Sequence, residues 1–292
     1  MPAFDYDSAF ARNLGWVTAE EQRRLRGKCV SIAGLGGVGG VHLLTLVRLG
    51  IGRFRLAEFD TFELVNFNRQ VGAAVNALDR PKLEVMAEMA RDINPSVELE
   101  LFPEGVTAEN VDSFLQGADL FADGLDFFAF AVRELVFAKC ASMGIPATTV
   151  APLGMGAALL NFMPGGMQFA DYFGLSECEE AEKPLRFLLG LAPAALHRRY
   201  LVDPTFVDLN ARRGPSTAMA CQICAGVAGT EALKILLKRG RVVAAPRGVH
   251  FDAYRNRLVH TWRPGGHRNP LQRVILAIAA RQFAQMRAAA GH

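Results

Sequence analysis

The chain has 292 residues, of which 51% are hydrophobic and 21% charged, as in an ordinary globular protein. Its formal net charge of +3 is too small to argue for nucleic-acid binding by itself. Five cysteines form no paired framework, which favours a reducing, cytoplasmic location. We expect neither a signal peptide nor a membrane span, because no basic apolar leader and no run of 18 uncharged apolar residues occurs.

Apolar patterns alternate between strand and helix spacing through the first half of the chain. Asp79 is a candidate N-cap of one helix, and Gly50 follows another as a helix-ending glycine. The predicted elements, in chain order, are a helix over 8–28, a strand over 29–36, a helix over 38–50, a strand over 53–60, a helix over 80–94, strands over 97–102 and 118–126, a helix over 130–144 and a strand from 145.

The second half is less regular. Residues 163–215 are punctuated by Gly and Pro, and we expect a loop and helical insertion there, with its acidic stretch mobile. A helical pattern returns at 219–240, and residues 248–262 predict a hairpin with its turn near Arg255-Asn256. A last amphipathic helix is expected over 270–289.

These elements predict an α/β fold with a doubly wound, Rossmann-like, mostly parallel sheet, helices on both faces, and a C-terminal hairpin and helix. We expect a single domain over 1–292. Its core would comprise 8–155 and 216–262, interrupted by the insertion over 163–215.

A glycine-rich turn follows the first predicted strand. Gly34, Gly36 and Gly39 have the G-x-G-x-x-G spacing, which lets backbone N–H groups approach a phosphate at a helix N-terminus. Glu58 and Asp60 end the second strand at about the distance where an acidic residue accepts ribose hydroxyls. These residues leave NAD, FAD and ATP equally open.

Cationic residues after the second strand favour ATP. Arg69 lies in Asn-Phe-Asn-Arg-Gln, a block that a nicotinamide enzyme does not require, and a guanidinium suits a triphosphate. Lys82 falls in the first turn of the next predicted helix, where anions are favoured. Asp126 closes the fourth strand at the edge where ligands sit, and Mg²⁺ needs only one or two carboxylates. The set indicates nucleotidyl transfer.

Five ordered motifs carry a resemblance to a known family. GLGGVGG, VNFNRQ, RPK, INP and DGLDFF, in this order and spacing, resemble the ThiF/MoeB/ubiquitin-activating (E1-like) superfamily of adenylyltransferases. The similarity covers 8–155 and returns at GVAGTEALKIL, and the stretch after 151 resembles a bacterial ThiF-like branch.

The resemblance implies that Mg-ATP adenylates a carboxylate, typically the C-terminus of a ubiquitin-like or sulfur-carrier protein or a peptide. Asp126 would hold Mg²⁺. Arg12 matches an arginine that reaches the ATP of the partner subunit, which implies a homodimer. Glu58 stands where the family usually has Asp. The residues that would bind ATP are Gly34, Gly36, Gly37, Gly39, Glu58, Asp60, Asn66, Arg69 and Lys82.

Ordinary structural roles remain open for the same side chains. Arg69 could pair with Asp60 or Glu63, Lys82 could be a solvated helix residue, and Asp126 could cap the helix after it.

Cysteines separate this chain from some relatives. Many have two C-x-x-C pairs for structural zinc, whereas this chain has only Cys221 and Cys224, so we expect no zinc. Both would lie on one buried helix stripe. Cys178 is a candidate covalent acceptor in a crossover loop, but the glutamates around it would disfavour a reactive thiolate.

The sequence predicts an ATP-dependent adenylyltransferase and does not identify its carboxylate substrate. Three alternatives stay open: a tRNA threonylcarbamoyladenosine dehydratase-like enzyme, an NAD(P)- or FAD-dependent oxidoreductase, and a non-catalytic nucleotide-binding scaffold. A cluster of basic residues could form a cleft for an acidic partner, a substrate tail or RNA phosphate. The residues of that cluster are Arg186, His197, Arg198, Arg199, Arg212 and Arg213.

Overall fold

The computed structural model describes residues 4–209 and 211–290, with 282–290 described by their backbone alone. Its centre is an eight-stranded sheet in the order β3-β2-β1-β4-β5-β6-β7-β8. The strands from β3 to β5 run parallel, whereas β6, β7 and β8 pair antiparallel. The strands are β1 (Cys29–Ala33), β2 (Arg53–Ala57), β3 (Glu98–Phe102), β4 (Leu120–Asp123), β5 (Ala147–Leu153), β6 (Gly156–Phe162), β7 (Arg247–Asp252) and β8 (Arg257–Trp262).

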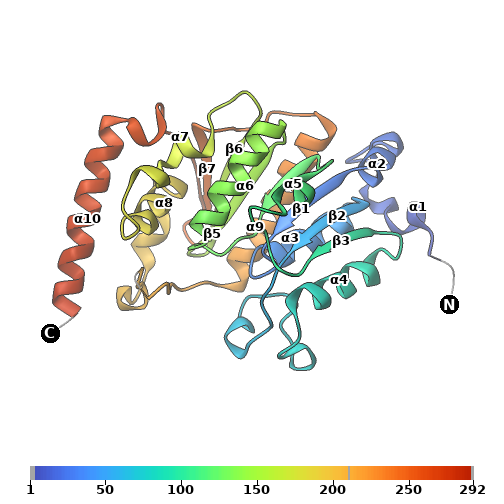
Figure 1. Ribbon diagram of the computed structural model, residues 1–292, viewed down its shortest axis with the longest axis horizontal. Helices are drawn as coiled ribbons and strands as arrows, with labels where there is room; N and C mark the ends of the chain where they lie inside the picture. Colours follow the sequence, from blue (N-terminus) through green and yellow to red (C-terminus); the bar gives the residue numbers. More distant parts are fainter. Residues whose placement is uncertain (1–3, 210, 291–292) are drawn as a thin grey trace.

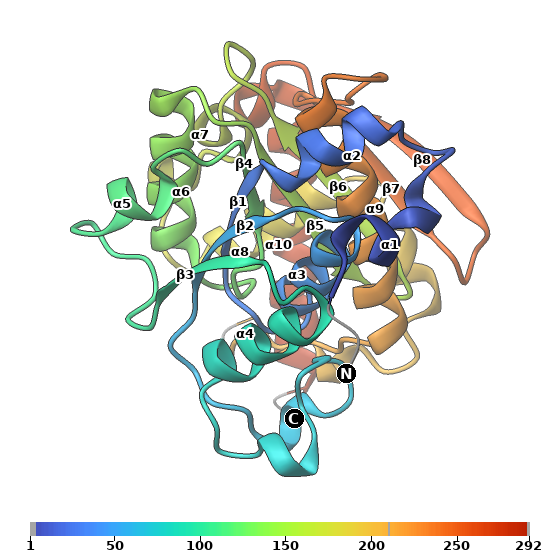
Figure 2. The ribbon, with the colours of Figure 1, turned by 90° about the vertical axis from the view of Figure 1, so that its right-hand side faces the viewer.

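Helices cover both faces of the sheet (Figures 1 and 2). α2, α3, α4 and α9 pack on one face around residues such as Leu43, Phe54 and Leu236. α5, α6, α7 and α8 pack on the other face around Phe114 and Phe137. The helices are α1 (Tyr6–Ala9), α2 (Ala19–Arg26), α3 (Gly39–Arg48), α4 (Lys82–Ile93), α5 (Val111–Leu115), α6 (Phe130–Met143), α7 (Phe169–Phe173), α8 (Lys183–Leu191), α9 (Ala218–Leu237) and α10 (Pro270–Ala290).

The predicted α/β class is confirmed, and the burial of each strand agrees with its position in the sheet. All five residues of β1 are buried, as expected of a central parallel strand covered on both faces. Edge strand β3 instead alternates between exposed and partly buried positions until its last residue, Phe102, which is buried. The predicted hairpin is β7–β8, with Asn256 at φ +51° in its turn. β6, which pairs antiparallel with β5, was not predicted.

Two predictions near helix starts are wrong. The single helix expected over 8–28 is divided into α1 and α2, because Gly15 takes φ +102° and Thr18 begins α2 with a capping box to Glu21. Asp79 does not cap α4. Its φ is +62°, and the N-cap position belongs to Pro81, which makes no side-chain cap bond.

The insertion over 163–215 contains helices as well as loop segments, and its acidic residues 177–182 lie between α7 and α8. It contains α7 and α8, whose aromatic side chains Phe169, Tyr172, Phe173 and Phe187 are buried. Their spacing places them on one side of short helices that pack against Phe162 of β6 and the neighbouring α6. Residue 210 lies outside the described residues.

Among the described residues, only α9 is long and apolar enough to span a membrane. It packs against β5, β6 and α3, so it serves as a core helix here. α10 lies at the end of the molecule opposite the N-terminus (Figure 1). The last residues of the predicted 1–292 domain lie outside the described residues.

Candidate active site

The carboxyl ends of β1, β2 and β4 meet at one edge of the sheet. The N–H of Gly34, which follows β1, donates to the carbonyl of Ala57 at the end of β2 (2.8 Å). The N–H of Gly124, which follows β4, donates to the carbonyl of Ala33 (2.9 Å). Three chain segments are thereby held together where ligands bind in open parallel sheets.

The glycines of the loop have two different roles. Gly34 has φ +81°, and a Cβ there would lie 2.3 Å from the Gly124 carbonyl oxygen. A Cβ on Gly39 would lie 1.7 Å from the Gly34 oxygen. At Gly36 and Gly37 the nearest atoms to such a Cβ belong to side chains, at 3.5 and 3.2 Å. Gly34 and Gly39 are therefore required by close backbone packing, whereas at Gly36 and Gly37 only side chains lie near the Cβ position, and their expected phosphate contacts stay a prediction.

This difference between the glycines predicts unequal losses of stability for two alanine substitutions. We expect Gly39→Ala to lower the free energy of unfolding by about 2–3 kcal/mol, since its Cβ overlaps a backbone atom that cannot move aside. Gly36→Ala is the matched control, and its loss should stay below about 1 kcal/mol, because its Cβ meets only the Gln70 side chain. Urea unfolding measures both values. Equal losses would contradict this difference.

Glu58 is engaged by the backbone. It is 8% exposed, and its carboxylate accepts N–H groups from Leu35 (2.8 Å), Phe59 (2.8 Å) and Asp60 (3.0 Å). The bond to Leu35 ties the end of β2 to the glycine loop. Its observed contacts are thus those of a positioning residue, and the expected ribose contact stays a prediction.

Lys82 begins α4 and is only 6% exposed. Its ammonium donates to Asp60 Oδ2 (3.1 Å), and its backbone N–H donates to the Asp60 carbonyl (2.9 Å). Asp60 itself has 54% of its side chain exposed. Lys82 is therefore not a solvated helix residue. It is a buried cation held at a helix N-terminus, a position that favours anionic ligands.

Arg69 lies against the glycine loop. Its side-chain methylenes are 3.7–3.9 Å from the Cβ position of Gly37. Nη1 donates to the Val65 carbonyl (2.9 Å) and to Asn68 Oδ1 (2.9 Å). Among the described residues no carboxylate forms an ion pair with Arg69, so the predicted alternative of a local ion pair is wrong. Its positive charge is available to a ligand.

The segment between β2 and α4 is held by its asparagines. Asn66 is buried, and its Oδ1 accepts the N–H of Glu63 (3.0 Å), so this side chain shapes the turn. Asn68 Nδ2 donates to the Ser216 carbonyl (2.9 Å), which links the segment to the start of α9. Gln70, which lies against Gly36, is 7% exposed, and its Oε1 has no partner in the described chain.

Asp126 is exposed on the loop between β4 and α6. Its Oδ1 accepts the N–H of Phe128 (2.9 Å). The N-cap position of α6 is Ala129, without a side-chain bond, so Asp126 does not cap this helix. Among the described residues its second carboxylate oxygen forms no hydrogen bond or ion pair, which suits a hydrated Mg²⁺.

A buried ion pair that the sequence did not predict orders the same loop. Arg133 Nε donates to Asp123 Oδ2 at 2.9 Å, and both side chains are at most 3% exposed. Arg133 also donates to the carbonyls of Leu125 (2.9 Å), Asp126 (3.0 Å) and Phe127 (3.3 Å). The sequence signal that could have predicted this pair was Asp123 at the end of a buried strand, because a buried carboxylate requires a cation as its partner.

Arg12 is not brought to the glycine loop of its own chain. It lies exposed beside Asn13, whose amide contacts the carbonyls of Arg48 and Leu49 at the C-terminal end of α3 (both 3.4 Å). The glycine loop precedes the other end of α3, and a ten-residue helix is about 15 Å long.

The cysteines are buried or partly buried. Cys221 and Cys224 are fully buried in α9, as predicted, and the Cys221 sulfur lies 3.2 Å from the Cβ position of Gly37. Burial raises the pKa of both thiols. Cys178 donates to the Leu175 carbonyl (3.3 Å). Burial is also the main cause that raises the pKa of the Cys178 thiol, with Arg186 opposing it.

The expected basic cluster does not form one cleft. Arg186 lines a cavity with Arg263, whereas Arg212 lines a different cavity beside Phe128. The His197 ring lies 6.0 Å from the His250 ring, with the two ring planes tilted by 46°. The insertion separates these residues because helices and turns, rather than one continuous loop, connect them.

Comparison with known proteins identifies the family. The ThiF family model matches residues 10–274. The chain belongs to the ThiF family. It is 35% identical over 146 residues to the vegetative HesA protein of Trichormus variabilis, covering 50% of this chain and 54% of that protein. It is 30% identical over 148 residues to the sulfur carrier protein ThiS adenylyltransferase of Escherichia coli, covering 51% and 58%.

The matches thus span little more than half the length of these curated relatives. Among solved structures, Escherichia coli MccB with ATP superposes with a TM-score of 0.62 at 18% identity, covering 86% of this chain and 67% of that one. This similarity supports the shared fold. The chain is therefore a ThiF-family protein with the E1-like α/β fold, homologous to known adenylyltransferases.

Proposed function

We propose that this protein is an ATP-dependent adenylyltransferase that activates a carboxylate. The observation that carries the proposal is the position of Arg69 against the glycine loop, together with Lys82, which Asp60 holds at the start of α4. Arg69 lies against Gly37 with no carboxylate partner among the described residues. Lys82 is buried and pairs with Asp60, whose N–H donates to the same Glu58 carboxylate that accepts the N–H of Leu35 in the glycine loop. Hydride transfer itself needs neither charge, whereas the charge on a triphosphate and its pyrophosphate leaving group favours both.

The reaction follows from these charges. A substrate carboxylate oxygen attacks the α-phosphorus of ATP, the bond from that phosphorus to the bridging oxygen breaks, and pyrophosphate leaves with the bonding electrons. The product is an acyl-adenylate. Arg69 and Lys82 stabilise the charge that develops on the leaving group, and the nucleophile is already ionised, so no general base is required. Asp126 would hold Mg²⁺, which would offset further phosphate charge.

The substrate class follows from one relative. The adenylyltransferase at 30% identity acts on the sulfur carrier protein ThiS, so we propose the C-terminal carboxylate of a sulfur-carrier or ubiquitin-like protein, or of a peptide. A cavity of about 370 Å³ beside the Asp126 loop, lined by Phe128, Pro184, Leu209 and Arg212 among others, would admit such a tail.

ATP–pyrophosphate exchange tests the proposal. Labelled pyrophosphate should enter ATP only when a carboxylate substrate is added, so carrier proteins and peptides form the first arms. A tRNA arm, with binding measured across salt concentrations, tests the dehydratase alternative. Absorbance of a bound flavin or nicotinamide would support an oxidoreductase instead. Failure of every arm together with absent ATP binding would refute the proposal.

We expect Cys178→Ser to leave the exchange rate unchanged, because adenylation needs no thiol. In the wild-type protein the Cys178 thiol should also react with iodoacetamide more slowly at pH 7 than the thiol of free cysteine, because its raised pKa leaves less thiolate. Mass spectrometry of the alkylated chain measures this rate. A thioester that forms in the wild type and is lost in Cys178→Ser would instead make Cys178 an acceptor.

We propose a homodimer in which Arg12 serves the partner's site. Arg12 lies at the far end of α3 from its own glycine loop, and apolar side chains stay exposed near the site, including Leu64 (72%), Val65 (67%) and Val75 (85%). Mixing Arg12→Ala with Lys82→Ala should restore exchange, because one site of the mixed dimer carries both residues. Each variant alone should be weak, and no restoration would contradict shared sites.

We also infer that the described chain forms one adenylyltransferase domain, because α7 and α8 of the insertion share an aromatic core with α6 and β6. A cytoplasmic location stays a prediction.

A further inference from the structure

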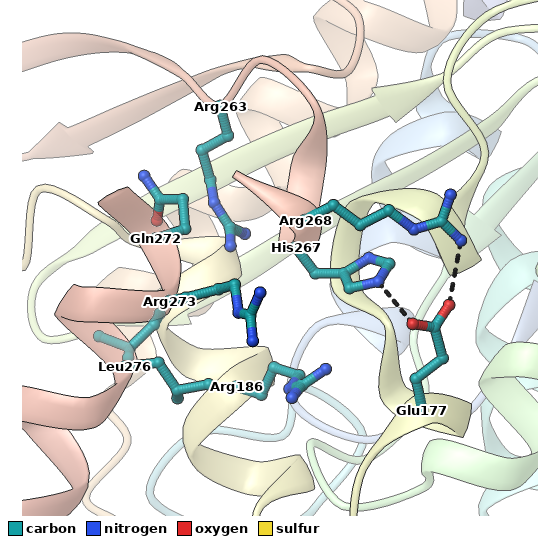
Figure 3. A pocket seen from close by; sticks show the side chains of 9 residues that line it. Glu177, Arg186, Arg263, His267, Arg268, Gln272, Arg273 and Leu276 are labelled. Atoms are coloured by element: carbon teal, nitrogen blue, oxygen red, sulfur yellow. Dashed lines mark hydrogen bonds and ion pairs between the residues drawn. The ribbon is translucent and has the colours of Figure 1, made fainter. Parts of the chain in front are cut away.

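A cavity of about 310 Å³ lies between α8, α10 and the turn before α10. Side chains from all three segments face it (Figure 3), and almost all of its charged groups are basic. The charged and ionisable residues that line it are Glu177, Arg186, Arg263, His267, Arg268 and Arg273. We call this cavity the arginine pocket.

Arg263 is the most constrained of these residues. It is 4% exposed, and neither Nε nor Nη1 has a hydrogen-bond partner in the described chain. Its guanidinium lies 4.8 Å from the centre of the Tyr172 ring. A Cβ on Gly190 of α8 would lie 2.8 Å from Nη1, so the glycine makes room for this group. The fold therefore holds a buried cation with unmet hydrogen bonds, an expensive arrangement without a counter-charge.

The other basic groups differ in whether a carboxylate already neutralises them. Glu177 accepts from Arg268 Nη2 (3.2 Å) and contacts His267 Nε2 (2.9 Å). Arg186 pairs with Glu182 and donates to the Gly174 carbonyl (2.8 Å). Within the described residues, Arg263 and Arg273 form no ion pair with a carboxylate.

The guanidinium groups of Arg186, Arg263 and Arg273 point toward the same space (Figure 3). Two of them have no carboxylate partner in the described part of the chain, so a ligand with two negative charges on neighbouring oxygens would complete the pocket. A phosphate group has this charge and binds guanidinium groups through paired hydrogen bonds. The volume of the pocket exceeds that of a few water molecules, each occupying about 30 Å³. It therefore leaves room for a small molecule to which the phosphate is attached.

We propose that the arginine pocket binds a phosphate group, either free or carried by a small molecule, at a site separate from the glycine loop. None of its lining residues belongs to the glycine loop or to the segment that carries Arg69 and Lys82.

Calorimetry tests this proposal on the full chain. The glycine-loop site is first saturated with a non-hydrolysable ATP analogue, and inorganic phosphate or glycerol phosphate is then titrated at constant ionic strength against sodium chloride. We expect one binding event, weakened about tenfold or more by Arg273→Ala. Arg273 is exposed on α10, so this variant should fold. Arg263→Lys should also weaken binding, because lysine keeps the charge but lacks the planar fork.

Arg91→Ala, at an exposed position on α4, is the matched control and should bind like the wild type. Tighter binding of glycerol phosphate would indicate a phosphorylated small molecule, and equal or tighter binding of inorganic phosphate would indicate free phosphate. Absence of binding by both probes, or unchanged binding in Arg273→Ala, would overturn the proposal. Failure of the ATP analogue to bind would count against the proposed adenylation alone.

Discussion

Replacing Lys82 by alanine is expected to lower ATP–pyrophosphate exchange by about 10²–10³-fold. The ammonium is nearly buried, is fixed by Asp60 at 3.1 Å, and lies at a helix N-terminus. A charge held in place before the reaction needs no reorganisation when the leaving pyrophosphate gains charge, so its removal should act on the transition state. ATP calorimetry beside the exchange assay separates lost binding from lost rate.

Lys139→Ala provides the matched control, because Lys139 pairs with Asp112 on α5 and touches none of the glycine-loop residues. It should exchange at the wild-type rate. Asp60→Asn should show a smaller loss than Lys82→Ala, since it loosens the ammonium without removing it. Equal exchange in Lys82→Ala and Lys139→Ala, with both variants folded, would remove Lys82 from the mechanism.

Replacing Arg133 by methionine is expected to lower the free energy of unfolding by about 3–5 kcal/mol. The substitution keeps much of the apolar stem but leaves the Asp123 carboxylate, 1% exposed, without its cation. It also removes three hydrogen bonds to loop carbonyls and the contact of the guanidinium with the Phe187 ring, 4.8 Å away. Urea unfolding with a fixed m-value measures the loss.

The double variant Asp123→Leu/Arg133→Met separates charge from packing. It should recover much of the lost stability, because no unpaired carboxylate remains buried. Its exchange rate should stay low, since the loop that carries Asp126 no longer has its carbonyls held. A double variant as unstable as Arg133→Met alone would show that packing, rather than the unpaired charge, sets the cost.

The geometry of the glycine loop and of the start of α4 was largely predictable because its signals are local. Gly34 and Gly39 are forced by close backbone approach, and Lys82 lies at the start of a helix that its own residues predict. Parallel strands then bring their carboxyl ends together at one edge, so residues distant in sequence meet without any further signal.

The contacts that order this edge were less predictable. Arg133 pairs with Asp123 ten residues earlier, across a loop whose geometry no local pattern specifies. The position of Glu58 predicts a ribose acceptor, but no sequence pattern predicts that its oxygens accept backbone N–H groups in the structure. Such assignments depend on which polar groups burial leaves unsatisfied, and this follows only from the packed fold.

The helices of the insertion were only partly predictable for a related reason. Its Gly, Pro and Glu residues suggest a mobile loop, but Phe169, Tyr172, Phe173 and Phe187 bury enough apolar surface against the sheet to fix two short helices. Arg263 in the arginine pocket gave no sequence signal, because its burial depends on Gly190 of α8 and on Tyr172.

A single-turnover reaction with ATP labelled at the α-phosphate tests the central claim most directly. With wild-type protein, Mg²⁺ and a carrier protein or peptide ending in a free carboxylate, the label should move to an acyl-adenylate, detected by mass spectrometry, as pyrophosphate is released. The same substrate with its C-terminus amidated should give no adduct. The opposite result would be ATP that binds at the glycine loop but whose labelled phosphate is transferred to no carrier protein, peptide or tRNA. That result would contradict adenylyl transfer.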